Sequence, residues 1–234
     1  MVSSNTSCIK CVDRKNICVC CQSKLIKNGF SRAGKQRYKC KFCNKTTVLN
    51  YRYNAYLANL NNKIILYIKE GLGIRSMARI LKISTTTLLK RIIKLAKLTE
   101  LPKINNQCSY EVDELCTFVQ HKNKRIWIVY VLERETKHVV DFRVGARTIL
   151  TLRASLNSIL RANPISVFTD KLAHYKSIIS SNIHKIVRFG TNRIERKNLT
   201  LRTHLKRLNR KTICFSRSAV FLEAVLKIYF GSIV

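Results

Sequence analysis

Acidic residues are scarce in this chain. Its 234 residues include 12 Asp and Glu against 45 Lys and Arg, a formal net charge of +33. The excess is spread along the chain, because residues 1–107 carry 22 basic and 3 acidic side chains and residues 108–234 carry 23 and 9. Both halves are therefore predicted to bind a polyanion. Each carboxylate in so basic a protein calls for a specific explanation.

Long apolar runs are also absent. The longest uninterrupted one, Ile126–Leu132, is far shorter than the roughly 20 residues that a membrane span requires. No signal-peptide pattern opens the chain, and we expect no membrane partner. A hydrophobic fraction of 46% with 24% charged residues favours folded domains over a disordered basic tail.

Cysteines are concentrated near the N-terminus, where the first 43 residues contain seven of the ten. Without a secretory signal, such clusters more often bind zinc than form disulfides. Cys18 and Cys21 form one CxxC pair, and Cys40 and Cys43 form another after 18 intervening residues. This is the spacing of a four-thiolate structural Zn²⁺ site.

Residues 1–50 are predicted to form a zinc ribbon that binds DNA. Leu25–Phe30 and Gln36–Cys40 have the composition of strands joined by a turn, and Arg32, Lys35 and Arg37 on this hairpin are candidate phosphate contacts. A ribbon that only stabilises the N-terminus is the alternative. Three further thiols are either spare, a rival ligand pair or half of a second site: Cys8, Cys11 and Cys20.

Residues 51–100 show helical periodicity and are predicted to form a helix-turn-helix domain. Ile74–Leu81, a turn at Lys82 and Ile83, and a second helix capped by Ser84 or Thr85 make up the motif. The second helix would lie in the major groove. Its candidate DNA contacts are Thr85, Thr86, Thr87, Lys90 and Arg91. A plain helical hairpin is the alternative.

Residues 108–234, after a linker near Pro102, alternate between strand and helix patterns. The expected strands are 110–120, 126–132, 139–144, 165–169 and 183–189, and the expected helices are 148–161, 172–180 and 192–209. Three antiparallel strands followed by crossovers to parallel ones predict an α/β mixed sheet of the ribonuclease H-like type. In that sheet the first strand is central and the fourth lies beside it.

Three carboxylates are the candidate active site: Asp113 in the first strand, Asp170 at the end of the fourth, and Glu195 on the last helix. Their oxygens would suit Mg²⁺ or Mn²⁺, and a pair of such ions promotes in-line displacement at phosphorus. Arg202 lies on the same helix face as Glu195 and could hold a phosphate.

Each acid has a simpler interpretation as well. Asp170 could only cap the next helix, and Glu195 could only pair with Arg196 or Arg202, although surface pairs contribute little. Strand alternation places Glu111 on the face of Asp113, so Glu111 could be the ligand or an auxiliary one.

Three segments resemble the transposases of insertion sequence 1 and its relatives. They are Glu111-Val-Asp-Glu, then Val167-Phe-Thr-Asp-Lys-Leu-Ala-His-Tyr175, and the block from Asn192 through Arg-Ile-Glu-Arg to Lys211. The Gly34-Lys-Gln-Arg-Tyr-Lys stretch before Cys40 is similar to the zinc region of that family. The chain departs from the family in its Cys8 and Cys11 pair, in Lys-Leu-Ala after Asp170, and in carrying both functional parts in one sequence.

The resemblance implies a DDE transposase in which Asp113, Asp170 and Glu195 bind metal and Arg202 is the basic residue that follows. Arg193, Arg196 and Lys197 of the same block are expected to contact DNA. Such an enzyme binds the terminal inverted repeats of its element, hydrolyses a strand and joins the freed 3′-hydroxyl to target DNA.

The resemblance further implies double-stranded DNA as the partner, a homodimer or larger oligomer, and a cytoplasmic, nucleoid-associated bacterial location. The alternatives are a catalytically inactive DNA-binding regulator, and a ribonuclease or resolvase on the same fold.

Overall fold

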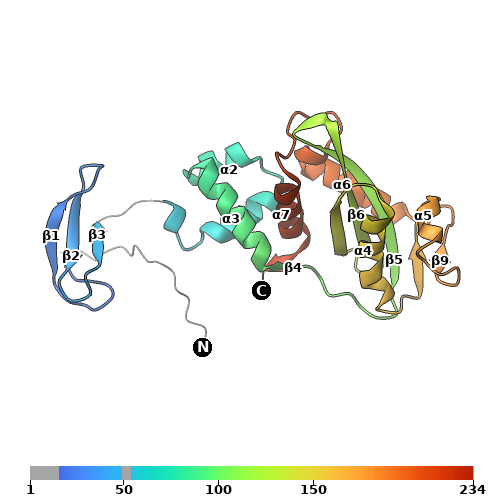
Figure 1. The fold of residues 1–234 in the computed structure, drawn as a ribbon, viewed down its shortest axis with the longest axis horizontal. Coiled ribbons are helices and arrows are strands. Elements are labelled where there is room, and N and C mark those ends of the chain that lie inside the picture. The colour runs from blue at the N-terminus through green and yellow to red at the C-terminus, as the bar shows by residue number, and fades with distance from the viewer. Residues whose placement is uncertain (1–15, 49–53, 234) are drawn as a thin grey trace. The chain divides into compact units, whose positions relative to one another are not determined.

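The structure is a computed structural model that describes residues 16–48 and 54–233. The chain divides into two compact units, the first ending at Tyr56 and the second spanning Leu57–Val234. Figure 1 shows the strands of the first unit and the mixed helices and strands of the second.

The first unit is a three-stranded antiparallel sheet in the order β1-β2-β3. Its strands are β1 (Leu25–Phe30), β2 (Gln36–Cys40) and β3 (Thr46–Val48), and a short 3-10 helix, η1 (Asn54–Tyr56), follows. The first two strands match the predicted hairpin, and β3 was not anticipated. Among the described residues of this unit, the buried cluster consists of Cys18, Leu25 and Cys40, which is a small apolar core. Cys8 and Cys11 lie outside the described residues.

The second unit begins with three helices, α1 (Leu60–Lys69), α2 (Ile74–Leu81) and α3 (Thr85–Leu98). The last two lie where the sequence predicted them. Lys82 turns the chain between them in the left-handed conformation at φ 52°, a position that favours Gly. Ser84 is the N-cap of α3, since its side chain accepts the Thr87 N–H.

The five-stranded mixed sheet has the order β7-β6-β5-β8-β9. Its strands are β5 (Ser109–Val119), β6 (His121–Glu133), β7 (Val139–Gly145), β8 (Ser166–Phe168) and β9 (His184–Lys185). The first three pair antiparallel, while β8 runs parallel to β5 and β9 parallel to β8. The prediction that the first strand is central with the fourth beside it is confirmed.

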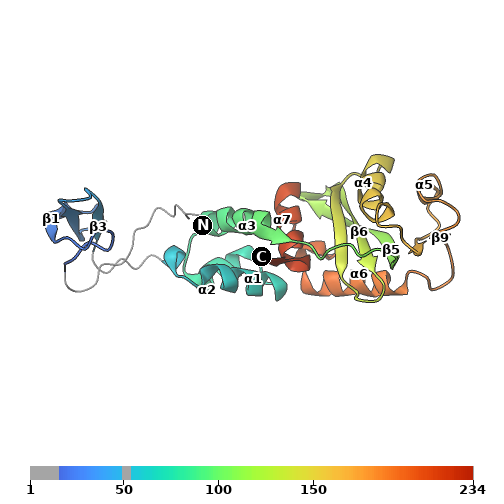
Figure 2. The same ribbon diagram turned by 90° about the horizontal axis from the view of Figure 1, so that it is seen from below.

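Helices cover both faces of this sheet, and Figure 2 shows α4 and α6 on opposite sides of it. The helices are α4 (Ile149–Leu160), α5 (Ala173–Lys176), α6 (Asn192–His204), the 3-10 turn η2 (Lys206–Leu208) and α7 (Ala219–Phe230). Tyr110 and Val112 of β5 face α4 and α5, and Leu115 faces α6 and α7. Alternation along β5 therefore builds two cores on one strand.

Helix α6 buries Ile194 and Leu201, and the buried stripe continues past its end in Leu205 and Leu208. Its regular part is shorter than expected and ends at His204, with η2 following. Helix α5 is also shorter than predicted. Ser177 ends it by bonding back to the His174 carbonyl, in a stretch rich in Ser that favours turns.

Helix α7 was missed by the sequence analysis. It is buried on most sides and packs against α1, α3 and β7, so it joins the helical part of the second unit to the sheet. After it, β10 (Ser232–Ile233) pairs antiparallel with β4 (Thr99–Glu100). Within the described residues, no helix combines the length and apolarity needed to cross a bilayer.

Candidate active site and cysteine cluster

Asp113 lies in the central strand β5, with its side chain on the α6 face. The Asn198 side chain donates to Asp113 Oδ2 at 2.6 Å, and the Glu114 N–H donates to Oδ1 at 2.7 Å. Burial raises the pKa of Asp113 to about 6, although both hydrogen bonds oppose the shift. Asp113 is thus a positioned carboxylate that is costly to leave charged without a cation.

Asp170 comes two residues after β8 ends. Because β8 is parallel to β5 with Phe168 opposite Glu111, continuing that register sets Asp170 beside Asp113. The side chain is exposed, and its Oδ1 accepts the Leu172 N–H at 2.9 Å. Asp170 therefore supports the turn into α5 and lies at the carboxylate site at the same time.

Glu114 completes a cluster with these two residues, since one carboxylate oxygen from each of the three lies within 4.8 Å of the others. The sequence analysis gave an auxiliary role to Glu111 instead. That residue is fully buried, accepts the Ile194 N–H at 2.9 Å, and has Arg134 Nε 3.0 Å away as an ion pair without hydrogen-bond geometry. Glu111 therefore holds the first turn of α6 against β5.

Glu195 is exposed on the first turn of α6, and its carboxylate accepts the Thr191 hydroxyl at 3.0 Å. It is not among the carboxylates that come within 4.8 Å of one another in the described residues, nor does it form an ion pair there. The helix that carries Glu195 does reach the carboxylates, however, because Asn198, one turn further on, donates to Asp113.

Arg202 lies one turn beyond Asn198 and is partly buried. Burial and neighbouring Arg210 lower the pKa of Arg202, while Asp113 raises it. Its Nε is buried and has no hydrogen-bond partner among the described residues, whereas buried polar atoms usually have one.

Asn198 and Tyr130 were not singled out as functional residues. The Tyr130 hydroxyl donates to Asn198 Oδ1 at 2.9 Å and also lies 3.1 Å from the Ile194 carbonyl. Asn198 was recognisable from its spacing, as it shares a helix face with Glu195 and Arg202. Nothing local marks Tyr130, which reaches α6 only through the folding of the sheet.

The four predicted cysteines come together in the first unit. Cys18 Sγ lies 3.5 Å from Cys43 Sγ, Cys21 Sγ lies 3.3 Å from Cys40 Sγ, and all four sulfurs are within 4.8 Å of one another. Tetrahedral Zn–S bonds imply sulfur separations of about 3.8 Å, so the residues fit a zinc ion.

The ionisation of these thiols is uneven. A backbone hydrogen bond from Ser23 lowers the pKa of Cys21 to about 6. The pKa of Cys43 is raised to about 12 by burial and the adjacent thiols, against a backbone hydrogen bond from Lys45. Cys20 is exposed, with Lys45 Nζ 3.2 Å from its sulfur, and is outside the four-thiol cluster.

The candidate DNA contacts differ in their accessibility. Exposed ones are Arg32, Lys35, Arg37, Thr85, Thr86, Lys90, Arg193 and Arg196. Others have structural partners: the Thr87 hydroxyl lies 2.8 Å from the Ser84 hydroxyl, and Arg91 donates to Asn61. Burial lowers the pKa of Lys197. Arg193 also lies 3.7 Å from the buried Glu111.

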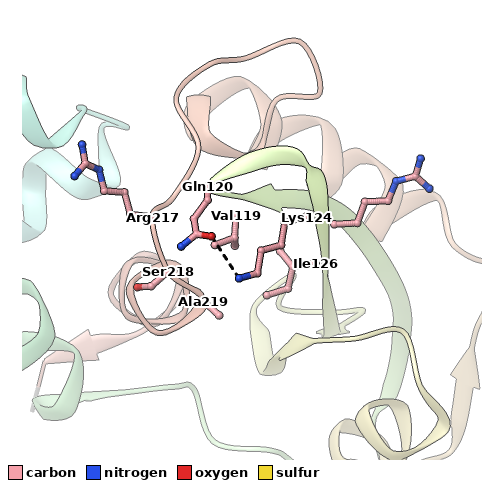
Figure 3. A pocket seen from close by; sticks show the side chains of 8 residues that line it. Val119, Gln120, Lys124, Ile126, Arg217, Ser218 and Ala219 are labelled. Atoms are coloured by element: carbon pink, nitrogen blue, oxygen red, sulfur yellow. Dashed lines mark hydrogen bonds between the residues drawn. The ribbon is translucent and has the colours of Figure 1, made fainter.

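Two hollows lie away from the carboxylates. One, of about 180 Å³, is lined by the β5–β6 turn and the start of α7, and its Lys124 donates to Gln120 (Figure 3). The second, an open hollow of about 420 Å³, has Arg75 and Arg79 of α2 and Thr85 of α3 in its wall. The sequence analysis did not identify these two arginines.

Comparison with known proteins identifies the family of this chain. The sequence profile described as "IS1 transposase" matches residues 107–232, more than half of the chain. The chain belongs to the IS1 transposase family. This family membership covers the mixed sheet, all three predicted acidic residues and α7.

Curated members of the IS1 transposase family align with about half of the chain. Insertion element iso-IS1n protein InsB of Shigella dysenteriae is 39% identical over 116 residues, 50% of this chain and 88% of its own length. The IS1 protein InsB of Shigella flexneri is 35% identical over 119 residues, 51% of this chain and 91% of its own length.

Solved structures are more distant. A chain of the simian T-cell lymphotropic virus intasome is 16% identical with a TM-score of 0.37, covering 69% of this chain and 66% of its own. The HTLV-2 integrase catalytic core domain in complex with magnesium is 14% identical with a TM-score of 0.36, covering 53% and 86%. Similarity at this level does not establish a shared fold.

Proposed function

We propose that this member of the IS1 transposase family is a DNA transposase whose residues 108–234 form a ribonuclease H-like catalytic domain. The observation that carries the proposal is the meeting of Asp113 and Asp170 at one end of the mixed sheet. The central position of β5, with β8 beside it, supports the fold assignment. The chain's charge of +33 supports a polyanionic substrate.

Asp113, Asp170 and Glu195 are proposed to hold Mg²⁺ or Mn²⁺. Closely spaced carboxylates repel one another, and hard oxygen donors are the ligands that these cations prefer. Divalent ions bound there would activate the attacking oxygen and stabilise the leaving one. Water serves as the nucleophile in the first cut, and the freed 3′-hydroxyl then attacks a target phosphodiester.

The neighbouring side chains prepare this site. Tyr130 fixes the orientation of the Asn198 amide, whose N–H then orients the Asp113 carboxylate. The guanidinium of Arg202, whose pKa Asp113 raises against the effect of burial, is proposed to hold a phosphate flanking the cleaved bond. None of these steps requires the helix backbone to move.

Glu195 does have to move. Its side chain bends back to Thr191, but it lies one turn before Asn198, which contacts Asp113. We propose that rotation about its own side-chain bonds, with loss of a single exposed hydrogen bond, turns it toward the cluster.

Zinc and DNA binding are assigned to the first 100 residues. Cys18, Cys21, Cys40 and Cys43 would hold a structural Zn²⁺, and the ribbon (1–50) with α2 and α3 of a helix-turn-helix (51–100) would bind the inverted repeats. We add Arg75 and Arg79 to the candidate phosphate contacts because they line an open hollow beside Thr85. Holding two ends together calls for a dimer or larger assembly.

The test is cleavage of a duplex oligonucleotide that carries the terminus of the protein's own element, with Mg²⁺ or Mn²⁺. Wild type should cut the strand, and Asp170→Asn should reduce cleavage at least about a hundredfold, as expected for loss of a metal ligand, while DNA affinity stays the same. Asp141→Asn is the matched control, because that acid bonds Ser158 away from the cluster.

A catalytically inactive DNA-binding regulator is the second candidate, and the outward position of Glu195 favours it. Glu195→Gln decides between the two. Loss of cleavage in this variant supports the transposase, whereas a wild-type protein that binds the terminus and never cuts it supports the regulator.

A further inference from the structure

We propose that Glu114 and Tyr175 form a staple that positions Asp170 beside Asp113. This inference deepens the proposed function and rests on it. Glu114 adjoins Asp113 in β5 but points to the opposite face of the sheet, where the Tyr175 hydroxyl donates to its Oε1 at 2.7 Å. Arg147 donates to Oε2 at 3.2 Å. Both oxygens of a buried carboxylate are thus engaged from other elements.

Asp170 needs such support because the pairing of β8 with β5 ends two residues before it. The ladder between β5 and β8 stops at Phe168, and Asp170 itself is exposed, with its side chain accepting only the Leu172 N–H among the hydrogen bonds of the described residues. The helix that follows, α5, has four residues, which is too short to be stable alone. The position of Asp170 therefore depends on what holds α5.

Tyr175 is that anchor. It is fully buried in the core between α5 and the sheet, and its hydroxyl reaches Glu114, the β5 residue that follows Asp113. The hydrogen bond links the two parts of the site: Glu114 is bonded covalently to Asp113 in β5, and Tyr175 is connected to Asp170 through the first residues of α5. Tyr175 lies five residues after Asp170, so the staple limits how far the two carboxylates can separate.

Arg147 reduces the electrostatic repulsion that Glu114 would add to Asp113 and Asp170. Its guanidinium offsets the charge of Glu114 and is itself held over the Trp127 ring at 4.7 Å. A buried carboxylate with both oxygens bonded is a fixed support. Glu114 is accordingly a positioning residue that acts through Asp113 and Asp170.

The experiment measures Mn²⁺ binding to the full-length, DNA-free protein by isothermal titration calorimetry. Tyr175→Phe keeps the packed ring and removes one hydroxyl. We expect Mn²⁺ affinity to fall about tenfold or more, the usual effect of losing support behind a metal ligand, and hydrogen exchange of residues 170–176 to accelerate. Glu114→Gln should weaken Mn²⁺ binding in the same way.

Tyr229→Phe is the matched control, since it also removes one tyrosine hydroxyl, here from a 2.8 Å hydrogen bond with His204 on the α6–α7 side. Its Mn²⁺ affinity should equal that of wild type. If Tyr175→Phe binds Mn²⁺ normally while Asp170→Asn does not, the staple is wrong and the proposed function stands. A wild-type protein that binds no Mn²⁺ overturns both.

Discussion

At the scale of single residues, the proposed chemistry depends on Asp113, whose carboxylate is half-buried beside Glu114 and Asp170. A carboxylate with a raised pKa is protonated more easily and binds cations only after losing its proton. The two hydrogen bonds from Asn198 and Glu114 keep it oriented in either state. The pH of the solution therefore controls whether the site can accept a metal.

Mn²⁺ binding should weaken as the pH falls. The pKa of Asp113 is about 6, so above pH 6 the carboxylate is available, and below it affinity should drop about tenfold per pH unit, because one proton must be released on binding. Titration calorimetry between pH 5 and pH 8 measures this. An affinity that is constant across this range would contradict the raised pKa or the role of Asp113 as a ligand.

At the scale of elements, the turn between α1 and α2 docks against the end of α6. Gly71 has φ +71°, and a Cβ at this position would come within 2.0 Å of the His204 carbonyl oxygen. Both the backbone conformation and the close approach require Gly. The helical part of the second unit is thereby in contact, at this turn, with the C-terminal end of the helix that carries Glu195 and Arg202.

Gly71→Ala should destabilise the second unit by about 3 kcal/mol or more, because it combines a strained φ with a clash against backbone. Thermal unfolding followed by circular dichroism gives the measurement. Gly73→Ala is the control, since a Cβ there meets no atom within 4 Å and its φ is −72°. Similar melting temperatures for the two variants would disprove the tight docking of Gly71.

At the scale of the whole molecule, the two units are stabilised differently. The first has a buried centre consisting largely of cysteine, and a unit so small rarely folds without metal or disulfides. The second has two apolar cores, one on each face of its sheet. Loss of zinc should therefore affect the first unit alone.

Cys40→Ser should remove the Zn²⁺ proposed for the four-thiol cluster, unfold the first unit and leave the second folded. Zinc content by atomic absorption and limited proteolysis would show this, with Cys20→Ser as the control because that thiol is outside the cluster. DNA affinity should fall about tenfold or more as the phosphate contacts of the ribbon are lost. Retention of zinc by Cys40→Ser would contradict the four-thiolate site.

Much of the fold was predictable because its signals are local. Strand patterns marked β5 and β7. Helix α7 had no such signal, because it is apolar on nearly every side and so lacks the amphipathic pattern of a surface helix. The strand predicted at 183–189 was too long, since β9 is limited to the two residues that pair with β8.

The candidate site was predictable in part. The rarity of acids pointed to Asp113 and Asp170, and the structure brings them together. Glu114 was not identified, because alternation directs it to the face opposite Asp113. Its carboxylate still joins the cluster with Asp113 and Asp170, beyond the point where the ladder between β5 and β8 ends.

The sequence by itself predicted a polyanionic partner and determined the thiol spacing and much of the order of strands and helices, because charge, ligand spacing and periodicity are properties of neighbouring residues. Only the tertiary structure decided which acids share one site, where Glu195 points, and that Tyr175 and Tyr130 support the carboxylates. Those relations depend on the register of β8 against β5 and on the docking of α5 and α6. Register and docking are set by packing between distant segments, which local sequence does not encode.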